Sequence, residues 1–255
     1  RALEILETVD LIAAEDTRHS GKLLSHYWIK TRLFALHDHN EKQKAQSLLN
    51  KIAEGNDVAL ISDAGTPLIS DPGYHLVNIA REQGVSVVPI PGPSAVVTAL
   101  CAAGLPTDKF LFAGFLPVKQ QAKATTLAHY KNADFTTVFY ESPRRIIDTL
   151  DAIAETLGDE KQIVVAKELT KHYESFTSGT AQQIKDWFAE DTDRQQGEMV
   201  LMLAPNKQES ALSVEAETLL KALCEELPIK KAAAITAKVH DLKKNDLYKL
   251  ALSWK

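Results

Sequence analysis

A group of acidic, basic and imidazole side chains follows an apolar run near the start of the chain. The run Leu11–Ala14 is typical of a buried strand, and Glu15, Asp16, Arg18 and His19 come directly after it. In open α/β sheets, ligands bind beyond the carboxyl ends of the strands. A carboxylate or an imidazole at this edge can accept a proton, and a guanidinium can hold a phosphate through two hydrogen bonds. The group therefore predicts a site with a general base and an anionic substrate.

An ordinary helix start explains the same residues at least as well. Asp16 or Thr17 is a good N-cap for the helix that follows, and Arg18 is then a solvated charge. On residue types alone, both interpretations stand.

Two later loops are rich in residues that break strands and helices. They are LISDAGTPLISDPG at Leu60–Gly73 and VVPIPGPSA at Val87–Ala95, each at the end of an apolar run. Glycine lets a ligand approach the backbone, and proline fixes a loop without an amide donor. Neither GxxxxGK[ST] nor GxGxxG occurs, so the loops match neither common phosphate cradle. We expect a cleft for a zwitterionic, adenosine-bearing ligand; two ordinary turns are the alternative.

His37 and His39 form a His-x-His pair in the segment LHDHN, Leu36–Asn40. Two imidazoles on one side of an extended segment can bind a metal ion, but the spacing suggests no third ligand. We therefore expect a polar loop here, in which His37 contacts the substrate, and no metal site.

The segment YESPRR, Tyr140–Arg145, follows another apolar strand, so Glu141 is placed to reach the same cleft. Arg144 and Arg145 are expected in the first turn of the next helix, where positive charge is unfavourable. This placement favours an anionic substrate. A surface pair that Asp148 neutralises explains it equally well.

Strand-like and helical patterns alternate along most of the chain. This alternation predicts an α/β fold, with a mostly parallel sheet between helices and a second α/β unit after it. The expected strands are 11–14, 33–36, 58–62, 85–90, 112–115, 137–140, 163–169 and 200–204. The expected helices are 21–27, 41–54, 74–83, 94–103, 146–157 and 181–189. The segments 167–175 and 197–203 are expected to complete the second sheet, with Lys167, Glu168 and Lys171 as exposed charges at the strand ends.

The last part of the chain is helical in pattern and basic. A stripe of leucines ends at Pro228, and two shorter helices are expected after it, to about His240 and Leu252. Residues 229–255 carry seven Lys against two Asp, in a chain whose net charge is −5. Three short helices with a basic final pair resemble a helix-turn-helix, which favours contact with a polyanion. A solvated lysine-rich helix face is the alternative.

The composition is that of an ordinary globular protein, with 255 residues of which 45% are hydrophobic and 25% charged. No apolar run approaches the roughly 18 residues of a membrane span, and no secretory signal opens the chain. Cys101 and Cys224 lie far apart without CxxC spacing, so we expect a reducing cytoplasm and no disulfide framework. Because Arg1 lies within a helical pattern, we also expect that a first strand precedes it.

Several of these segments occur together, in the same order, in one family. They are AAEDTRHS, HDHN, SDAGTPLISDPGYHLV, PIPGPSA, GFLP, FYES, KELTK and GEMV, followed by the KKAAA…KKNDLYK tail. Over essentially its whole length, the chain resembles the ribosomal RNA methyltransferases of the tetrapyrrole methylase superfamily. The family's first cofactor loop, a turn with Pro and Gly after strand one, has no counterpart in the sequence.

The resemblance implies a two-lobed α/β fold with a cofactor cleft between the lobes, and a small helix-turn-helix-like domain. The expected divisions are 1–107, 108–205 and 211–255. It implies S-adenosylmethionine as the cofactor and 2′-O-methylation of a cytidine in the decoding region of 16S ribosomal RNA. The partner is then small-subunit rRNA or the ribosomal particle, and the enzyme is a cytoplasmic homodimer without a membrane contact.

The resemblance also implies roles for particular residues. Glu15, Asp16 or His19 is expected to act as the base. Cofactor contacts are expected from Ala64, Gly65, Thr66, Pro67, Ile69, Asp71, Ser94, Ala95, Tyr140 and Glu141. Contacts with the RNA are expected from Arg18, His37, Arg144, Lys230, Lys231, Lys243 and Lys244.

Two other functions are compatible with the sequence. A methylase of a porphyrin-like or corrin ring would share the cofactor loops, but it should have an apolar, ring-wide groove and no basic helical tail. A nucleic-acid-binding regulator would use the α/β body to sense a nucleotide.

Overall fold

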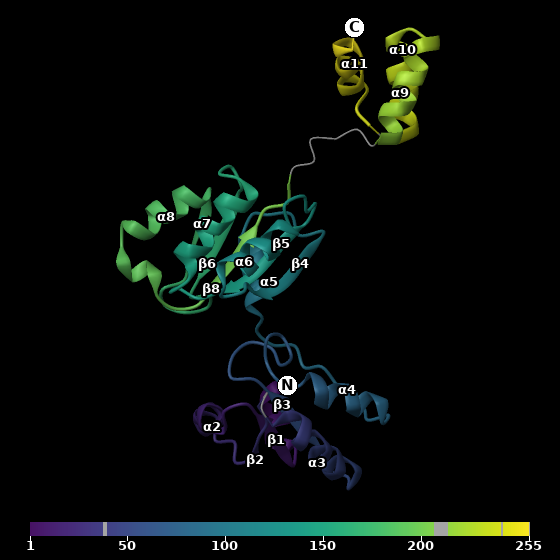
Figure 1. Cartoon of the computed structure of the whole chain (residues 1–255). Coiled ribbons are helices and arrows are strands. Elements are labelled where there is room, and N and C mark those ends of the chain that lie inside the picture. Colours follow the sequence, from purple (N-terminus) through teal and green to yellow (C-terminus); the bar gives the residue numbers. More distant parts are fainter. Residues whose placement is uncertain (38–39, 207–213, 241, 255) are drawn as a thin grey trace. The chain divides into compact units, whose positions relative to one another are not determined.

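The computed structural model describes residues 1–37, 40–206, 214–240 and 242–254. The chain divides into two compact units, Arg1–Pro205 and Asn206–Lys255 (Figure 1). His39 and residues 207–210, which separate the second and third expected divisions, lie outside the described residues. The expected division of the first unit near residue 107 stays a prediction.

The first sheet has three parallel strands, which confirms the prediction from the alternating pattern. Their order is β2 (Arg32–Ala35), β1 (Leu11–Ala14) and β3 (Val58–Ile61). In the register of the sheet, Ala14 lies opposite Ala35 on one side and Ile61 on the other. The carboxyl ends of all three strands therefore meet at one edge.

Helices cover both faces of this sheet, and β1 is therefore buried on both sides. The helices are α1 (Ala2–Thr8), α2 (Thr17–His26), α3 (Glu41–Ala53) and α4 (Tyr74–Glu82). Leu11 and Ala13 pack in one cluster with α3 and α4. Ile12 packs in another, with Leu24 of α2 and Leu6 of α1. Successive residues of β1 therefore pack on opposite faces of the sheet, as the two-residue period of a strand requires.

The strand expected at Val85–Ile90 was wrong: the segment has no ladder partner among the described residues. Val87 and Val88 are exposed. Pro89 and Pro91 are two residues apart, so both would lack an amide donor along the same edge of a strand. The apolar composition suggested a strand, but the prolines remove the hydrogen bonds that would hold one.

The second sheet has five strands in the order β4, β5, β8, β6 and β7. Its strands are β4 (Phe110–Phe115), β5 (Thr136–Glu141), β6 (Ile163–Lys167), β7 (Ser175–Gly179) and β8 (Met199–Leu203). Its helices are α5 (Ala95–Ala102), α6 (Gln120–Ala128), α7 (Ile146–Leu157) and α8 (Ala181–Ala189), and a short 3-10 helix, η1, spans Thr192–Gln195. Only β4 and β5 pair in parallel, and the other neighbours are antiparallel. A mostly parallel arrangement therefore does not extend to this sheet, since β8 lies between β5 and β6 and runs antiparallel to both.

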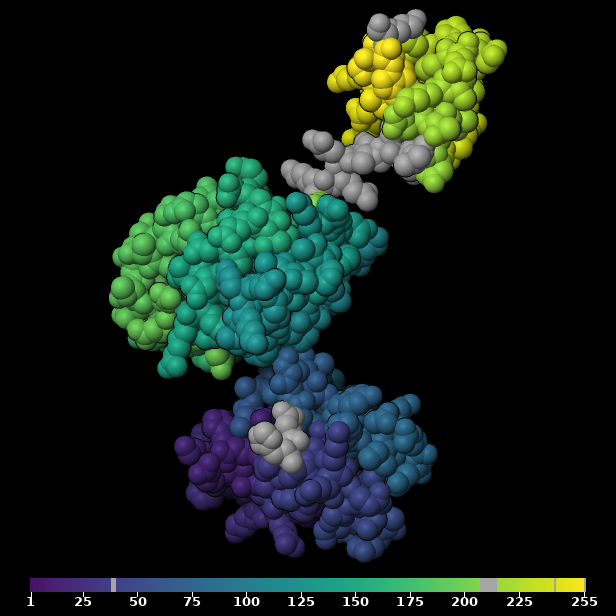
Figure 2. All heavy atoms as spheres, viewed as in Figure 1, coloured from purple at the N-terminus to yellow at the C-terminus, as the bar shows by residue number. Residues whose placement is uncertain are grey.

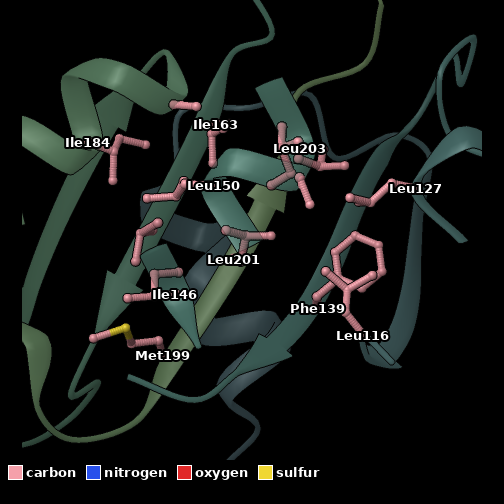
Figure 3. Packing of buried hydrophobic residues seen from close by; sticks show 14 of the residues in the cluster. Leu116, Leu127, Phe139, Ile146, Leu150, Ile163, Ile184, Met199, Leu201 and Leu203 are labelled. Carbon is pink, nitrogen blue, oxygen red and sulfur yellow. The ribbon is translucent and has the colours of Figure 1, made fainter. Parts of the chain in front are cut away.

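Both faces of the second sheet are buried at its middle strands, β5, β8 and β6. Phe139 of β5 and Leu201 of β8 face a core shared with α6, α7 and α8 (Figure 3). Val138 and Met202 face the other side, where α5 packs. This double burial explains why β6 and β8 are nearly continuous apolar runs rather than alternating patterns.

Two expectations for this sheet were wrong in their boundaries. The segment Lys167–Ser175 is not a strand, since the residues after Lys167 form turns until β7 begins at Ser175. Pro143, Arg144 and Arg145 form a turn before α7 and not its first helical turn. Helix α6 was not predicted from the sequence.

The second unit contains three helices, as predicted: α9 (Val214–Glu226), α10 (Ile229–His240) and α11 (Lys244–Ser253). Leu220, Ala232, Ala233, Leu247 and Ala251 form its buried core. The three helices pack against one another, and Figure 2 shows their atoms as one closely packed group. Within the described residues, no helix is long and apolar enough to span a membrane.

Candidate functional site

A cavity of about 420 Å³ lies beside the loop that follows β3. From this loop, the predicted cofactor residues Ala64, Gly65, Thr66, Ile69 and Asp71 line the cavity. The predicted cofactor residue Pro67 is not part of the lining. A volume of this size is typical of a site for a small organic ligand.

The loop holds its shape through an unusual backbone. Leu68 and Ser70 have positive φ angles of 72° and 66°, which side chains other than glycine rarely adopt. Gly73 closes the loop, and a Cβ there would collide with the side chains of Leu60 and Leu68. Such strained backbone is concentrated at binding sites, where the surrounding contacts enforce it.

A hydrogen bond joins the two breaker-rich loops. Thr66 Oγ1 donates to the carbonyl oxygen of Pro93 over 2.7 Å. Ala95, the first residue of α5, also lines the cavity, whereas its predicted neighbour Ser94 does not. This geometry is consistent with the prediction that the two loops form one site. The ligand contacts stay predictions.

The end of β5 supplies another wall of the cavity through Tyr140 and Glu141. Tyr140 packs edge-on against Phe112 and Phe115, with ring centroids 4.8 and 5.5 Å apart. Burial raises the pKa of the Tyr140 phenol, and the charges of Asp71 and Glu198 raise it further. The phenol therefore stays neutral at physiological pH and keeps its O–H donor.

The lining is acidic. Asp71, Glu141 and Glu198 all contribute to it, and no Lys, Arg or His is among the described residues of the wall. A cavity with this charge attracts a cation and repels a phosphate. Glu141 is paired with Arg145 and Glu198 with Lys171, and neither base belongs to the lining. The lining therefore suits a positively charged ligand better than a nucleoside di- or triphosphate.

A network of charged side chains holds Glu141 in place. Its side chain is fully buried, and its Oε1 accepts a hydrogen bond from the backbone amide of Ser142 over 2.7 Å, with Arg145 Nε 3.3 Å away. Its Oε2 accepts one from Thr149 Oγ1 over 2.8 Å. Behind Thr149 lies Lys123, which is only 2% exposed and whose Nζ donates to Thr149 Oγ1 over 3.1 Å. The carboxylate is thus fixed in one orientation before any ligand arrives.

The predicted base residues lie at the carboxyl edge of the first sheet. Glu15 is half-buried, and His19 is exposed on α2. The backbone amide of Asp16 donates to Asp63 Oδ1, at the end of β3, over 3.2 Å. None of the three predicted bases lines the acidic cavity, so the base assignment stays a prediction.

Asp16 forms the N-cap of α2. Its Oδ1 accepts hydrogen bonds from the backbone amides of Arg18 and His19, and its carboxylate pairs with the Arg18 side chain over 3.2 Å. The hydrogen bond from the Arg18 side chain is the largest of several causes that lower the pKa of Asp16 to about 2. A carboxylate with so low a pKa is a weaker base than an unperturbed one. The structure therefore bears out the capping interpretation of Asp16.

The other predicted RNA contacts of this unit lie apart from the cavity lining. His37 is half-buried, and its Nε2 is 2.8 Å from the side-chain amide nitrogen of Asn40. Arg144 is exposed, whereas Arg145 donates to the carbonyl oxygens of Leu116 and Pro117. Within the described ranges, no group of three His, Cys, Asp or Glu side chains has a metal-binding arrangement.

The sequence matches models of two known protein families. The family model for tetrapyrrole (corrin/porphyrin) methylases matches residues 1–185. The chain belongs to the tetrapyrrole methylase family. A second model, the RsmI C-terminal HTH domain, matches residues 210–255. The predicted fold class and the helix-turn-helix character of the final helices are thereby confirmed.

Curated relatives of this methylase match it over nearly its whole length and share about half of its residues. Ribosomal RNA small subunit methyltransferase I of Escherichia coli O157:H7 is 53% identical, over 99% of this chain and 88% of that protein. The protein of the same name from Haemophilus influenzae is 52% identical, over 99% of this chain and 90% of that protein. The one from Pseudomonas aeruginosa is 45% identical over the same shares.

Solved structures of other methylases share the fold. A cobalt precorrin-4 methyltransferase matches with a TM-score of 0.56 and 18% identity, over 79% of this chain and 86% of that one. The uroporphyrin-III-C-methyltransferase from Thermus thermophilus matches with a TM-score of 0.53 and 19% identity, over 80% and 86%. At such identities the likeness concerns the fold alone.

Several residues around the cavity of this methylase were not predicted from the sequence. They come from the ends of β4 and β6 and from the start of β8, and include Phe115, Leu169, Glu198, Met199 and Val200. The segment GEMV contains Glu198, Met199 and Val200. Its place in the site follows only once β8 is known to run antiparallel to β5, because the start of β8 then lies at the same edge as the end of β5.

In the helical unit of this methylase, the four predicted RNA-binding lysines are all exposed. Lys230 and Lys231 lie at the start of α10, and Lys243 and Lys244 at the start of α11. An exposed lysine at a helix start is available to a polyanion. Their contact with RNA stays a prediction.

Proposed function

We propose that this chain transfers the methyl group of S-adenosylmethionine to the 2′ oxygen of a cytidine ribose in small-subunit ribosomal RNA. Its family makes it a methyltransferase that uses S-adenosylmethionine. The observation that carries the proposal is the charge of the cavity, with Asp71, Glu141 and Glu198 in its wall. S-adenosylmethionine bears a sulfonium and an ammonium against one carboxylate, so its net positive charge suits this wall.

The residues of the wall fit the parts of this cofactor. Carboxylates suit the ammonium and the ribose hydroxyls as hydrogen-bond acceptors. Phe115 and Tyr140 offer aromatic surface to a flat ring or to the sulfonium. Gly65 has a positive φ of 69° and open space where a Cβ would stand, so a ligand can approach its backbone closely.

When bound, S-adenosylmethionine supplies an electrophilic methyl group for attack by the ribose oxygen. The attacking oxygen, the methyl carbon and the sulfur must be nearly in line, so most of the rate comes from positioning. Removal of the hydroxyl proton helps a weak nucleophile, and we assign this step to Glu15 or His19. Asp16, with its low pKa, orients Arg18 and the start of α2.

The remaining contacts are proposed for the RNA. Arg18, His37 and Arg144 would hold phosphates or sugars near the reaction centre. The lysines of the helical unit would add affinity for the backbone that does not depend on sequence. An rRNA substrate places the reaction in the cytoplasm, and we expect the enzyme to act as a homodimer, which sedimentation equilibrium would test.

Calorimetry tests the cofactor assignment directly. The full chain should bind S-adenosylmethionine and should not bind ATP, because ATP phosphates would face three carboxylates. An Asp71→Asn, Glu198→Gln double variant should weaken cofactor binding at least five-fold. Binding of ATP in preference to S-adenosylmethionine would instead support a nucleotide-sensing regulator.

Ribose methylation mapping tests the reaction. Small ribosomal subunits from cells that lack the gene should gain one 2′-O-methylcytidine when incubated with the protein and S-adenosylmethionine. Methyl transfer to a corrin or porphyrin ring, with no transfer to the subunits, would overturn the proposed substrate.

A further inference from the structure

The turn between β6 and β7, Glu168–Glu174, is held in a strained conformation. Glu168 and Thr170 have positive φ angles of 51° and 65°. Thr170 donates its backbone amide to Glu174 Oε2 over 2.6 Å. Lys171 Nζ donates to Glu168 Oε1 and to Glu198 Oε2, each over 2.9 Å. A short exposed turn that needs this many bonds to hold an unfavourable backbone indicates a functional segment.

This turn separates the acidic cavity described above from a second cavity of about 890 Å³. Leu169 and Glu198 line the first cavity, whereas Glu168 lines the second. Gly197 lines both. A Cβ at Gly197 would collide with the Glu168 carboxylate, so the wall between the cavities has no room for a side chain there. The two cavities are therefore neighbours across a thin wall.

The second cavity offers an aromatic surface and hydrogen-bond acceptors. Tyr173 is 71% exposed and lines the cavity. Trp187 also lines the cavity, and the Arg194 guanidinium stacks over its ring at 4.6 Å. Asp191 and Asp193 of the η1 region add carboxylates to those of the turn.

The charges of this cavity select what can enter it. Its wall has four carboxylates, from Glu168, Glu174, Asp191 and Asp193, and two basic side chains other than histidine, Lys167 and Arg194. Arg194 is already bonded to the Trp187 carbonyl and paired with Glu190. A phosphate would be repelled, whereas an uncharged ring with an amino group could stack and donate to a carboxylate.

We propose that the second cavity receives the base of the nucleotide that is methylated, turned out of its RNA helix, with Tyr173 as the stacking surface. The base is a cytosine, whose exocyclic amine donates to one of the carboxylates. With the base in this cavity, its ribose lies at the thin wall by Gly197, next to the cavity assigned to the cofactor. The inference rests on the proposed rRNA methylation and adds the place at which the target base is recognised.

Steady-state methyl transfer to unmethylated small subunits tests this site. Tyr173→Ala should lower kcat/KM for the subunits by roughly 5- to 150-fold, the usual effect of losing one base-stacking contact. Tyr173→Phe keeps the aromatic surface and should stay within about two-fold of the wild type. The Kd for S-adenosylmethionine, measured by calorimetry, should be unchanged in both variants, because Tyr173 does not line the first cavity.

Trp28 provides a matched control. It is 87% exposed and lines neither cavity, so Trp28→Gly should leave kcat/KM unchanged. The inference is overturned if Tyr173→Ala transfers methyl groups as well as the wild type does. It is also overturned if Tyr173→Phe is as impaired as Tyr173→Ala, because the ring would then have no stacking role.

Binding of the subunits without cofactor separates this inference from the proposed function. If the wild type binds subunits but transfers no methyl group, the proposed reaction fails. In that case, the binding of subunits by Tyr173→Ala still tests whether the second cavity receives RNA. Weaker binding than that of the wild type supports the inference, and equal binding overturns it. If the wild type does neither, both proposals fall.

Discussion

Replacement of Lys123 by methionine should destabilise the protein strongly, although this side chain does not line the acidic cavity. Lys123 is 2% exposed, and its hydrogen bond of 3.1 Å to Thr149 is followed by one of 2.8 Å from Thr149 to Glu141. Methionine keeps most of the volume of lysine, so the change removes the charge without opening a large cavity. The variant therefore tests the ion network rather than the packing.

The expected size follows from the geometry. End to end, the two hydrogen bonds place the ammonium within about 6 Å of the carboxylate, where unit charges attract by about 3 kcal/mol at an effective dielectric constant of 20. A loss of this size should lower the unfolding midpoint by about 6 to 12 °C in a unit of this length. Because the Thr149 hydroxyl would lose the donor behind it, Glu141 would be held less firmly, and the Kd for S-adenosylmethionine should also rise.

Scanning calorimetry of Lys123→Met, Glu141→Gln and the double variant measures the coupling. The double variant should cost about 3 kcal/mol less than the sum of the single variants, because it removes both charges together. Lys119→Met, at an exposed lysine just before the same helix, is the control and should shift stability by less than about 0.5 kcal/mol. Additive effects of the two single variants would refute the network.

Three further predictions follow from local geometry. Trp28 has a positive φ of 61° directly after α2. Trp28→Gly should therefore stabilise the protein by about 1 kcal/mol and raise the unfolding midpoint. A lower midpoint would contradict this. The pKa of Asp16 is lowered to about 2 from 3.8, so its charge stabilises the fold above pH 4, and this contribution is lost as the pH falls toward 2. The difference in midpoint between wild type and Asp16→Asn should therefore shrink over that range, and a constant difference would count against the Arg18 pair. Thr66→Val removes the hydrogen bond to Pro93 and should cost about 1 kcal/mol and weaken cofactor binding several-fold, as urea unfolding and calorimetry would measure.

The first sheet could be predicted from the sequence because each strand and each helix there has its own local signal. Gly55 and Gly84 follow α3 and α4, and apolar runs mark β1 and β3. The segment Val85–Ile90 shows where this reasoning fails. Apolar residues indicate burial, but a strand also needs a partner and donors, and two prolines remove donors there.

The candidate site was predicted where its residues lie in one loop and was missed where tertiary structure assembles it. Ala64–Asp71 stands out in the sequence as a cluster of Gly, Pro, Ser and Asp. Lys123 does not, because nothing local distinguishes a buried lysine from the exposed lysines of the same region. Its role depends on Thr149 and Glu141, which lie at least 18 positions away. The order of β8 in its sheet is likewise a long-range property that no local pattern contains.

The position of β8 has a consequence for the order of events during synthesis. β8 is the last strand of the chain to be made, yet it lies between β5 and β6 in the middle of the second sheet. Until residues 199–203 leave the ribosome, β5 and β6 have no partner on their facing edges, and contacts so distant in sequence form slowly. Met199 and Val200 of this strand also belong to the wall of the acidic cavity, to which we assign the cofactor. The nascent chain should therefore gain the ability to hold its cofactor only when almost the whole first unit has been synthesised.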